Sequence, residues 1–454
     1  MSPDGLQASS EKMRAADVGD AAIDTFAHYY EQLREGASGM LPESDIEPVA
    51  DLPTLEELPE GDPAIVDTAV VLKHNGGLGT SMGMTKAKSL IEAKEGETFL
   101  DIVVGQVLGL RERFGARVPL VLMNSFATRD DSLEALRRHP RIESDVPLDF
   151  LQNKVPKIDA ETLQPVTWEP DPTLEWAPPG HGDLYTALVT SGMLDTLLQH
   201  GYRYAFVSNS DNLGAVLDAR ILSWVASEEL PFAMEVAGRT EADRKGGHIA
   251  RLKEGGLVLR ETAQTPEEDL ASLQDVGRHR YVNTNNLWVG LEALRATLDA
   301  RDGVLGLPII VNRKTVDPSN SGSPAVVQLE TAMGAAIGVF DGARALHVPR
   351  RRFAPVKTTN DLLALRSDAY VLRDDCRVEL ASERDEPPVI DLDADYYKLV
   401  GDFEPRFPAG PPSLVACERL TVEGDVTFGR GVVVRGAVTV QGPARIEDGA
   451  ELTE

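Results

Sequence analysis

Cysteine is scarce in this sequence, with only Cys376 and Cys417 among 454 residues. Two cysteines cannot build a disulfide framework or an all-cysteine zinc site, and we expect a reduced, cytoplasmic setting. No run of 18 apolar residues occurs, so we expect no transmembrane helix. The net negative charge argues against a membrane partner, because an anionic membrane would repel it. The first 20 residues have no apolar stretch behind a basic start, so no secretory signal is expected.

Positive charge is also in short supply, since 45 lysines and arginines face 73 aspartates and glutamates, giving a net charge of −28. This balance argues against a nucleic-acid partner, because two polyanions repel each other. If the protein binds phosphates, the site must supply its own local positive charge or a metal ion. The length suits about three domains, or one large domain with an appendage.

Residues 1–64 predict little regular structure. Residues 1–20 are small and polar, and we expect them to be disordered. Residues 41–64 are rich in proline and acidic residues and are expected to form an extended arm. One amphipathic helix is predicted between these segments from apolar residues at helical spacing, namely Ile23, Phe26, Tyr30 and Leu33.

Strand-like and helix-like segments alternate over residues 65–382, which predicts a doubly wound α/β domain. Ligand sites in such sheets lie at the carboxyl ends of the strands, where polar residues follow apolar runs in this sequence. The expected strands are Ala69–Lys73, Val118–Met123, Tyr204–Ser208, Phe232–Val236 and Ile309–Val311. The expected helices are Phe99–Arg113, Leu184–Gln199 and Leu217–Glu229.

The C-terminal segment has a different pattern. Residues 383–413 hold many prolines and acidic residues, which is typical of a linker, with one or two anchored aromatics. Over residues 414–454 an apolar period of six with intervening glycines predicts a parallel β-helix of about two coils, and a small antiparallel sheet is the alternative. The two apolar rows are Leu420, Val426, Val432 and Val438, and then Val422, Phe428, Val434 and Val440.

The sharpest local signal is a glycine-rich turn between an expected strand and an expected helix, over residues 72–83, with Lys88 shortly beyond it. Glycines let backbone N–H groups come close to a phosphate. The turn has neither the spacing of a Walker loop nor that of the dinucleotide fingerprint. Taken alone it is equally compatible with a structural turn, and the nearby Lys88 favours phosphate binding.

This turn resembles the nucleotide-binding loop of the eukaryotic-type UTP–glucose-1-phosphate uridylyltransferases, also called UDP-glucose pyrophosphorylases. The likeness extends over roughly residues 65 to 452, with further motifs in the family's order. Several long motifs in register are far more specific than one glycine run. These motifs are Leu122–Phe126, Pro178–Asp183, Val207–Asn212, Asn283–Trp288, Gln328–Thr331 and Pro355–Thr359.

The resemblance implies a Rossmann-like (GT-A-like) nucleotidyltransferase domain over residues 65–382 and a short left-handed parallel β-helix over residues 414–454. It implies that UTP and glucose 1-phosphate react to give UDP-glucose and pyrophosphate, with Mg²⁺ as cofactor. Some family members assemble through this tail, and a short solenoid has exposed ends. We therefore hypothesise a homo-oligomer formed through the C-terminal β-helix.

The resemblance also implies a role for each residue at a matching position. Lys88 and Lys357 are implied as the catalytic cations at the phosphates, and Asp211 as the metal ligand. The implied UTP-binding residues are His74, Asn75, Gly76, Gly77, Met123, Gln152, Gly180 and Asn209. The implied sugar-phosphate-binding residues are His181, Lys245, Gly247, Asn283, Asn285 and Glu330.

The residues themselves also allow ordinary explanations. Asp211 follows an apolar strand, where a carboxylate can bind Mg²⁺ or cap a loop. His181 lies between two glycines before a helix, where anions bind well, although a lone histidine is more often a buried polar residue. Asn283 and Asn285 would point the same way on an extended backbone, as sugar-binding amides or as turn amides.

Two positions depart from the family's usual pattern. His74 stands where leucine is common, and Lys86-Ala87 stands where Gly-Pro is common. Lys86 could therefore compete with Lys88 for the phosphates. The position of Lys88 relative to Ser89 matches the family, so Lys88 is the expected phosphate ligand.

Three other functions are alternatives to the implied uridylyl transfer. A pyrophosphorylase for another or several UDP-sugars usually carries an arginine after Gly-Thr, where this chain has Ser81-Met82. A hexapeptide-repeat acyltransferase needs more coils and a catalytic histidine, but no histidine follows His347. A non-catalytic relative is disfavoured because the two lysines, Asp211 and His181 are retained.

Overall fold

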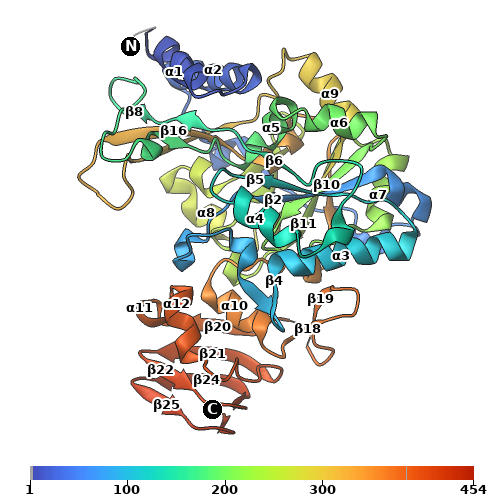
Figure 1. Ribbon diagram of the computed structural model, residues 1–454, viewed down its shortest axis with the longest axis vertical. Coiled ribbons are helices and arrows are strands. Elements are labelled where there is room, and N and C mark those ends of the chain that lie inside the picture. Colours follow the sequence, from blue (N-terminus) through green and yellow to red (C-terminus); the bar gives the residue numbers. More distant parts are fainter. Residues whose placement is uncertain (1–3, 385, 454) are drawn as a thin grey trace.

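A 10-stranded mixed sheet forms the centre of the computed structural model, which describes residues 4–384 and 386–453 (Figure 1). The first four strands named below run parallel to one another, whereas β14 is antiparallel to β10. From one edge the order is β6 (Asp149–Leu151), β5 (Leu120–Asn124), β2 (Ala69–Asn75), β10 (Tyr204–Asn209), β14 (Tyr281–Gly290), β12 (His248–Leu252) and β1 (Ile46–Pro48). Off this path lie β11 (Phe232–Gly238), β13 (Leu257–Arg260) and β17 (Arg344–His347).

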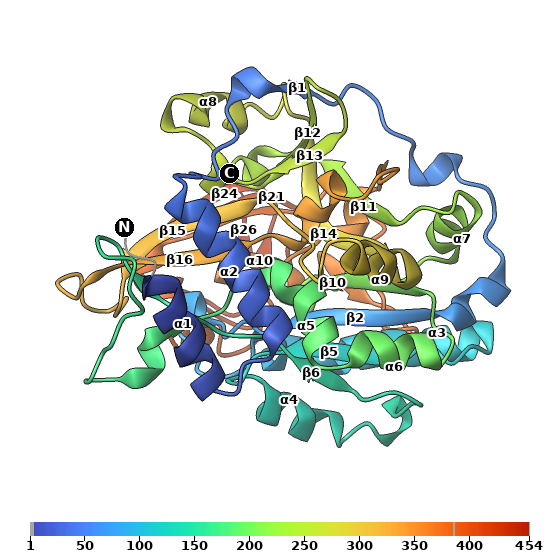
Figure 2. The same cartoon turned by 90° about the horizontal axis from the view of Figure 1, so that it is seen from above.

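Helices cover both faces of the sheet, because apolar residues alternate between two cores along each central strand. On β2, Val70 and Leu72 belong to one core and Ala69 and Val71 to the other. The first core includes α5 (Leu184–Thr190), α6 (Met193–Gln199) and α9 (Leu291–Asp299), which lie together in Figure 2. The second includes α3 (Phe99–Phe114), α7 (Ala219–Ser227) and α10 (Thr359–Arg366).

The expected α/β class and the five expected strands are confirmed, but the doubly wound sheet is mixed rather than parallel throughout. The helix expected over residues 184–199 is two helices, because Gly192 adopts a left-handed φ of 72° between α5 and α6. Helix α3 has the predicted bounds to within one residue. Thr98 caps its first turn by accepting from Asp101 N at 3.1 Å, and Gly115 ends it with φ of 61°.

The expectation of disorder for residues 1–20 is wrong over the described part, because α1 (Asp4–Ala15) precedes the expected helix α2 (Asp20–Arg34). This segment is polar overall, but its Met13 side chain is fully buried against α2 and its neighbours. Both helices pack on a small antiparallel sheet of β8 (Ile158–Asp159), β16 (Ala325–Thr331) and β15 (Ile309–Thr315). Residues 1–3 lie outside the described residues.

The acidic arm has little regular structure apart from short 3-10 turns, but its residues 46–48 form β1 and pair with β12. The expected linker over residues 383–413 also contains a strand and two short helices. They form because buried aromatic side chains anchor this otherwise polar segment. These elements are β20 (Val389–Leu392), α11 (Ala394–Tyr397) and α12 (Val400–Phe403). No helix in the described residues is both long and apolar enough to cross a membrane.

The C-terminal strands pair in parallel in three small sheets, and most paired residues from β21 onward lie 18 residues apart, as Glu423 and Gln441 do. Within them, Leu420 pairs with Val438, Phe428 with Ile446 and Val434 with Leu452 in register. The sheets are formed by β20, β21 (Cys417–Glu423) and β24 (Gly436–Gln441), by β22 (Val426–Phe428) and β25 (Ala444–Ile446), and by β23 (Val433–Val434) and β26 (Glu451–Leu452).

A buried ion pair connects the central sheet to the segment that precedes α10. Glu235 on β11 is fully buried and accepts from Arg352 Nε at 2.7 Å and Nη2 at 2.6 Å. Trp288 Nε1 and Asn286 Nδ2 on β14 donate to the same carboxylate at 3.0 and 3.1 Å. Arg352 is therefore part of the core, whereas its neighbour Arg351 is exposed.

Replacing Arg352 with methionine should destabilise the fold by about 3–5 kcal/mol, because Glu235 would keep its charge in the core without a cationic partner. The measurement is the free energy of unfolding in urea. Arg351→Met is the matched control, since Arg351 is exposed and its loss should change stability by less than about 0.5 kcal/mol. Equal stability of the two variants would contradict a structural role for the pair.

Candidate active site

Polar residues gather where the parallel strands β2 and β10 end. His74 and Asn75 are the last residues of β2, and Asn209 is the last residue of β10. Asn209 lies in register beside His74, and Asp211 follows in the turn after β10. The carboxyl edge of these strands is the expected ligand edge of an open α/β sheet, and it is where the glycine-rich loop begins.

The glycine-rich loop after β2 turns back on itself through a bridge between Leu78 and Ala87. A Cβ atom on Gly76 would lie 2.6 Å from Gln152 Oε1, so a larger residue would push Gln152 away. Gly77 has open space around it, and its carbonyl accepts from Lys88 N at 3.2 Å. The loop thus contacts both Gln152 and Lys88, while the backbone of Gly77 stays accessible.

Asp211 binds two lysines that are distant in the sequence. Its Oδ2 accepts from Lys88 Nζ at 2.7 Å and from Lys357 Nζ at 3.1 Å. Lys88 also donates to the carbonyl of Val356, and Val356 N donates to Asp211 O at 3.1 Å. Asp211 and Lys88 are largely buried, whereas the Lys357 side chain is 56% exposed and can reach outward to a ligand.

The neighbouring lysines determine the protonation state of Asp211. Burial alone would raise the pKa of Asp211, but the nearby Lys357 and Lys88 outweigh burial and hold that pKa below its ordinary value. The carboxylate is therefore ionised at neutral pH. Two lysines face this one carboxylate, so basic side chains outnumber acidic ones among these three residues.

The turn before α5 contains Gly180 followed by His181. Gly180 has φ of 78°, and a Cβ there would collide with the backbone of Thr331 on β16. Met333 N donates to His181 Nδ1 at 3.0 Å, so the neutral ring carries its proton on Nε2. Burial lowers the pKa of His181 to about 3 and that of His74 to about 4, and the two rings lie 6.2 Å apart.

A second group of polar residues lies where β14 bends. Asn285 has φ of 57°, so the backbone is not extended there and the condition for the two side chains to point the same way is not met. The two asparagines instead bind each other at 2.9 Å. Asn283 N donates to Gly247 O at 2.9 Å, and a Cβ on Gly247 would meet the Glu261 carboxylate. Glu330 on β16 is 3.5 Å from Lys314.

Several implied residues have side chains that are already engaged or lie elsewhere. Met123 is fully buried in the core beneath the sheet. Asn75 Nδ2 donates to Asn124 and Ser132, both at 2.8 Å, so this amide stabilises the strand ends. Lys245 is exposed and its carbonyl accepts from Thr262, while Lys86 is exposed and Lys88 makes the contact with Asp211.

Three polar residues of this region had not been singled out from the sequence. Lys73 is buried within β2, donates to Ser208 Oγ at 2.7 Å and Ala215 O at 2.9 Å, and burial lowers its pKa to about 7. Burial raises the pKa of Glu261 against an opposing hydrogen bond from Asn283. Asp183 lies buried behind His181. A lysine inside an apolar strand was the available signal for Lys73, whereas Glu261 gave none.

A glycine-rich loop and a carboxylate bound to two lysines lie at the ligand edge of an α/β sheet. This fold and this site are those of a nucleotidyltransferase. A family model described as UTP–glucose-1-phosphate uridylyltransferase matches residues 23–435. The chain belongs to this family.

Known proteins are similar over most of the chain. The UTP–glucose-1-phosphate uridylyltransferase of Solanum tuberosum is 42% identical over 410 residues, which cover 89% of this chain and 84% of the relative. A probable enzyme of the same name from Schizosaccharomyces pombe is 40% identical over 373 residues, covering 82% and 72%. A mutant UDP-glucose pyrophosphorylase of Leishmania major, solved in complex with UDP-glucose, has a TM-score of 0.96 at 47% identity and covers 100% of this chain and 99% of its own.

His181 should remain neutral well below the pH at which a free histidine becomes charged, because its burial disfavours the imidazolium form. Long-range ¹H–¹⁵N correlation spectra at about pH 5.5, roughly one unit below the pKa of a free histidine, should show the tautomer with the proton on Nε2. The assignment uses His181→Asn, which removes one resonance pair. A doubly protonated ring at that pH would contradict this environment.

Proposed function

We propose that this protein transfers the uridylyl group of UTP to glucose 1-phosphate, giving UDP-glucose and pyrophosphate. The observation that carries the proposal is the lysine pair on Asp211 beside the glycine-rich loop. Membership of the family and the 42% identity with a named uridylyltransferase support the same reaction.

In this reaction a nonbridging oxygen of glucose 1-phosphate attacks the α-phosphorus of UTP in line with the bond to pyrophosphate. One P–O bond forms as the other breaks, and its electron pair leaves with pyrophosphate. The attacking oxygen is already anionic at neutral pH, so no protein nucleophile or strong base is needed. Catalysis consists of positioning and of offsetting the repulsion between two polyanions.

The proposed nucleotide subsite lies around the glycine-rich loop. The Gly76-Gly77 backbone would bind phosphate oxygens, and Gln152, which lies against Gly76, would read the edge of the uracil. His74, Asn75, Met123, Gly180 and Asn209 would line this subsite, with Asn75 and Met123 contributing backbone only, because their side chains are engaged or buried.

The proposed sugar-phosphate subsite lies on the side of β14 and β16. His181 would donate from Nε2, since Nδ1 already accepts from Met333 N. Asn283, Asn285 and Glu330 offer amides and a carboxylate for hydroxyls, and the backbone of Lys245 and Gly247 borders them. Lys88 and Lys357 would contact the phosphates between the two subsites.

The proposed metal is Mg²⁺, with Asp211 as its protein ligand. Among the residues that the structure describes, no cluster of three or more acidic, histidine or cysteine side chains could hold a metal alone. The donor set nevertheless fits, because both short lysine contacts fall on Oδ2 and Oδ1 has only a 3.4 Å contact. Mg²⁺ commonly takes one or two carboxylates together with substrate phosphates, and when bound it neutralises phosphate charge.

We also propose that residues 414–454 form a short left-handed parallel β-helix through which the protein forms homo-oligomers in the cytoplasm. The three parallel sheets with partners 18 residues apart support the β-helix. The final coil leaves Ile446 and Leu452 partly exposed, which suits stacking against a second copy. Light scattering tests assembly: a wild-type mass of 49.2 kDa would reject it, and Ile446→Glu should shift an oligomer to that mass.

The reaction is tested by incubating the protein with UTP, Mg²⁺ and a sugar 1-phosphate, and measuring pyrophosphate release. We expect release with glucose 1-phosphate and much less with the galactose and N-acetylglucosamine forms. EDTA should abolish release, and added Mg²⁺ should restore it. Comparable release with several sugars would indicate a broad UDP-sugar pyrophosphorylase, and no release with any sugar would reject the proposed reaction.

Replacing Lys88 or Lys357 with alanine should lower kcat by about 10² or more, the scale for losing one charge-stabilising donor. Lys86→Ala is the matched control, because Lys86 is an exposed lysine of the same loop and should keep wild-type turnover. Steady-state rates of UDP-glucose formation measure the effect. Near wild-type turnover in both lysine variants would defeat their assignment.

A further inference from the structure

Two segments of the proposed nucleotide subsite come from different parts of the chain and must keep a fixed separation. Gln152 follows β6, while Gly180 and His181 lie in the turn before α5. The outer side of that turn is attached to β16, because Thr331 N donates to Pro179 O at 3.0 Å. Its inner side faces the Gln152 segment, and the contact there involves residues that neither subsite includes.

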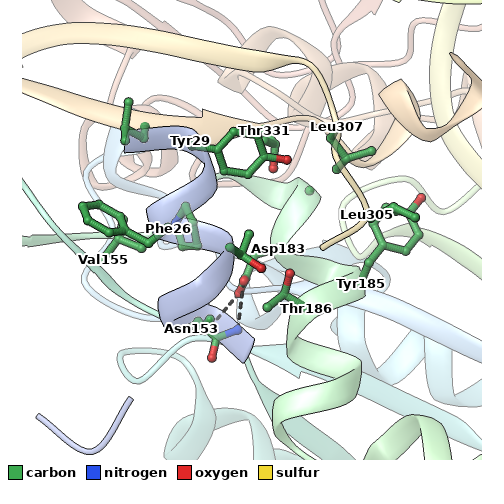
Figure 3. Close-up of a pocket in the computed structure, with 15 residues that line it drawn as sticks. Phe26, Tyr29, Asn153, Val155, Asp183, Tyr185, Thr186, Leu305, Leu307 and Thr331 are labelled. Atoms are coloured by element: carbon green, nitrogen blue, oxygen red, sulfur yellow. Dashed lines mark hydrogen bonds between the residues drawn. The ribbon is translucent and has the colours of Figure 1, made fainter. Parts of the chain in front are cut away.

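Asp183 makes this inner contact with both of its carboxylate oxygens. Oδ2 accepts from the backbone N of Asn153 at 2.6 Å, and Oδ1 accepts from Asn153 Nδ2 at 2.9 Å (Figure 3). Asn153 directly follows Gln152, and Asp183 is two residues beyond His181. The two bonds therefore join the Gln152 segment to the Gly180–His181 turn at the residues next to the proposed ligand contacts.

The surroundings of this contact are largely apolar, and one further hydrogen bond fixes the Asn153 amide. Phe26 and Tyr29 of α2 and Tyr185 of α5 line a small cavity beside Asp183 (Figure 3). Thr190 Oγ1 donates to Asn153 Oδ1 at 3.1 Å, which fixes the orientation of the amide so that Nδ2 faces Asp183. Burial raises the pKa of Asp183 to about 7, against the opposing bonds from Asn153. A buried carboxylate with few donors is costly, so its partners must stay in place.

We propose that Asp183 is a positioning residue that holds Gln152 and the Gly180–His181 turn at the separation UTP requires, and thereby sets UTP affinity and selectivity for uracil. The proposal rests on the proposed function, because it assumes that these two segments contact the nucleotide. The hydrogen bonds of the Asp183 side chain go to Asn153 and to neither subsite, and only its backbone N bonds a subsite residue, the carbonyl of Gly180 at 3.3 Å. Loss of the Asp183 carboxylate should therefore weaken UTP binding much more than it slows turnover at saturating substrate.

The chain allows a reciprocal swap as a test. In Asp183→Asn the new amide would face the Asn153 amide, donor against donor, and in Asn153→Asp two carboxylates would face each other. In the double variant the amide introduced at position 183 accepts from the backbone N–H of residue 153 and donates to the carboxylate introduced there. Both hydrogen bonds are thus restored, which makes a double-mutant cycle informative.

We expect each single variant to raise the KM for UTP about tenfold, the scale of a lost charged hydrogen bond, and to reduce the preference for UTP over CTP. kcat and the KM for glucose 1-phosphate should change by less than about twofold to threefold, and the double variant should recover most of the UTP affinity. Asp195→Asn, on the exposed face of α6, is the control with wild-type constants.

Calorimetric titration of UTP and thermal unfolding of the same variants separate the possible failures. An unchanged KM and Kd for UTP in both folded single variants would overturn the proposal, as would a swap that unfolds at the wild-type temperature without regaining affinity. If the wild type binds UTP but forms no UDP-glucose, the proposed function fails, while the UTP titrations still decide the role of Asp183.

Discussion

The carboxylate of Asp211 is the point on which the site depends, because it holds together segments that the chain keeps far apart. Lys88 is 123 residues before it and Lys357 is 146 residues after it, yet both amines bind the same oxygen. Without that carboxylate, two lysines at this distance would repel each other and move apart. The pairing therefore places two basic side chains beside the glycine-rich loop of an otherwise acidic protein.

A rigid scaffold places Lys357 within reach of Asp211. Asn212 Nδ2 donates to Arg352 O at 3.2 Å and its Oδ1 accepts from Ala354 N at 3.0 Å, which aligns the following residues alongside the turn after β10. Arg352 is in turn fixed by its ion pair with Glu235 in the core. The buried ion pair thus acts on the site through backbone geometry, since it fixes where the segment carrying Lys357 begins.

Sequence reasoning located the main features because strands, glycine turns and charged residues at strand ends have local signatures. The central strands are themselves short apolar runs, and the glycine-rich loop and the turn with Asp211 directly follow two of them. The structure places this loop and this turn at one edge of one sheet. The prediction failed where long-range packing decides the conformation. The polar N-terminal segment becomes α1 because Met13 finds a core supplied by α2 and distant strands. The bend at Asn285 arises from a register shift between β11 and β14, which a single strand's sequence does not reveal.

Desolvation favours the uncharged form of each buried group around the site, and at Asp211 neighbouring charges outweigh it. It keeps the imidazoles of His74 and His181 uncharged, so they act as neutral hydrogen-bond donors or acceptors and add no charge. It would also favour a protonated Asp211, but the lysines overcome it. The two histidines consequently add no positive charge near neutral pH, and the basic groups that contact Asp211 are Lys88 and Lys357. The metal proposed on Asp211 would add positive charge at the position where the phosphates of the two substrates would meet.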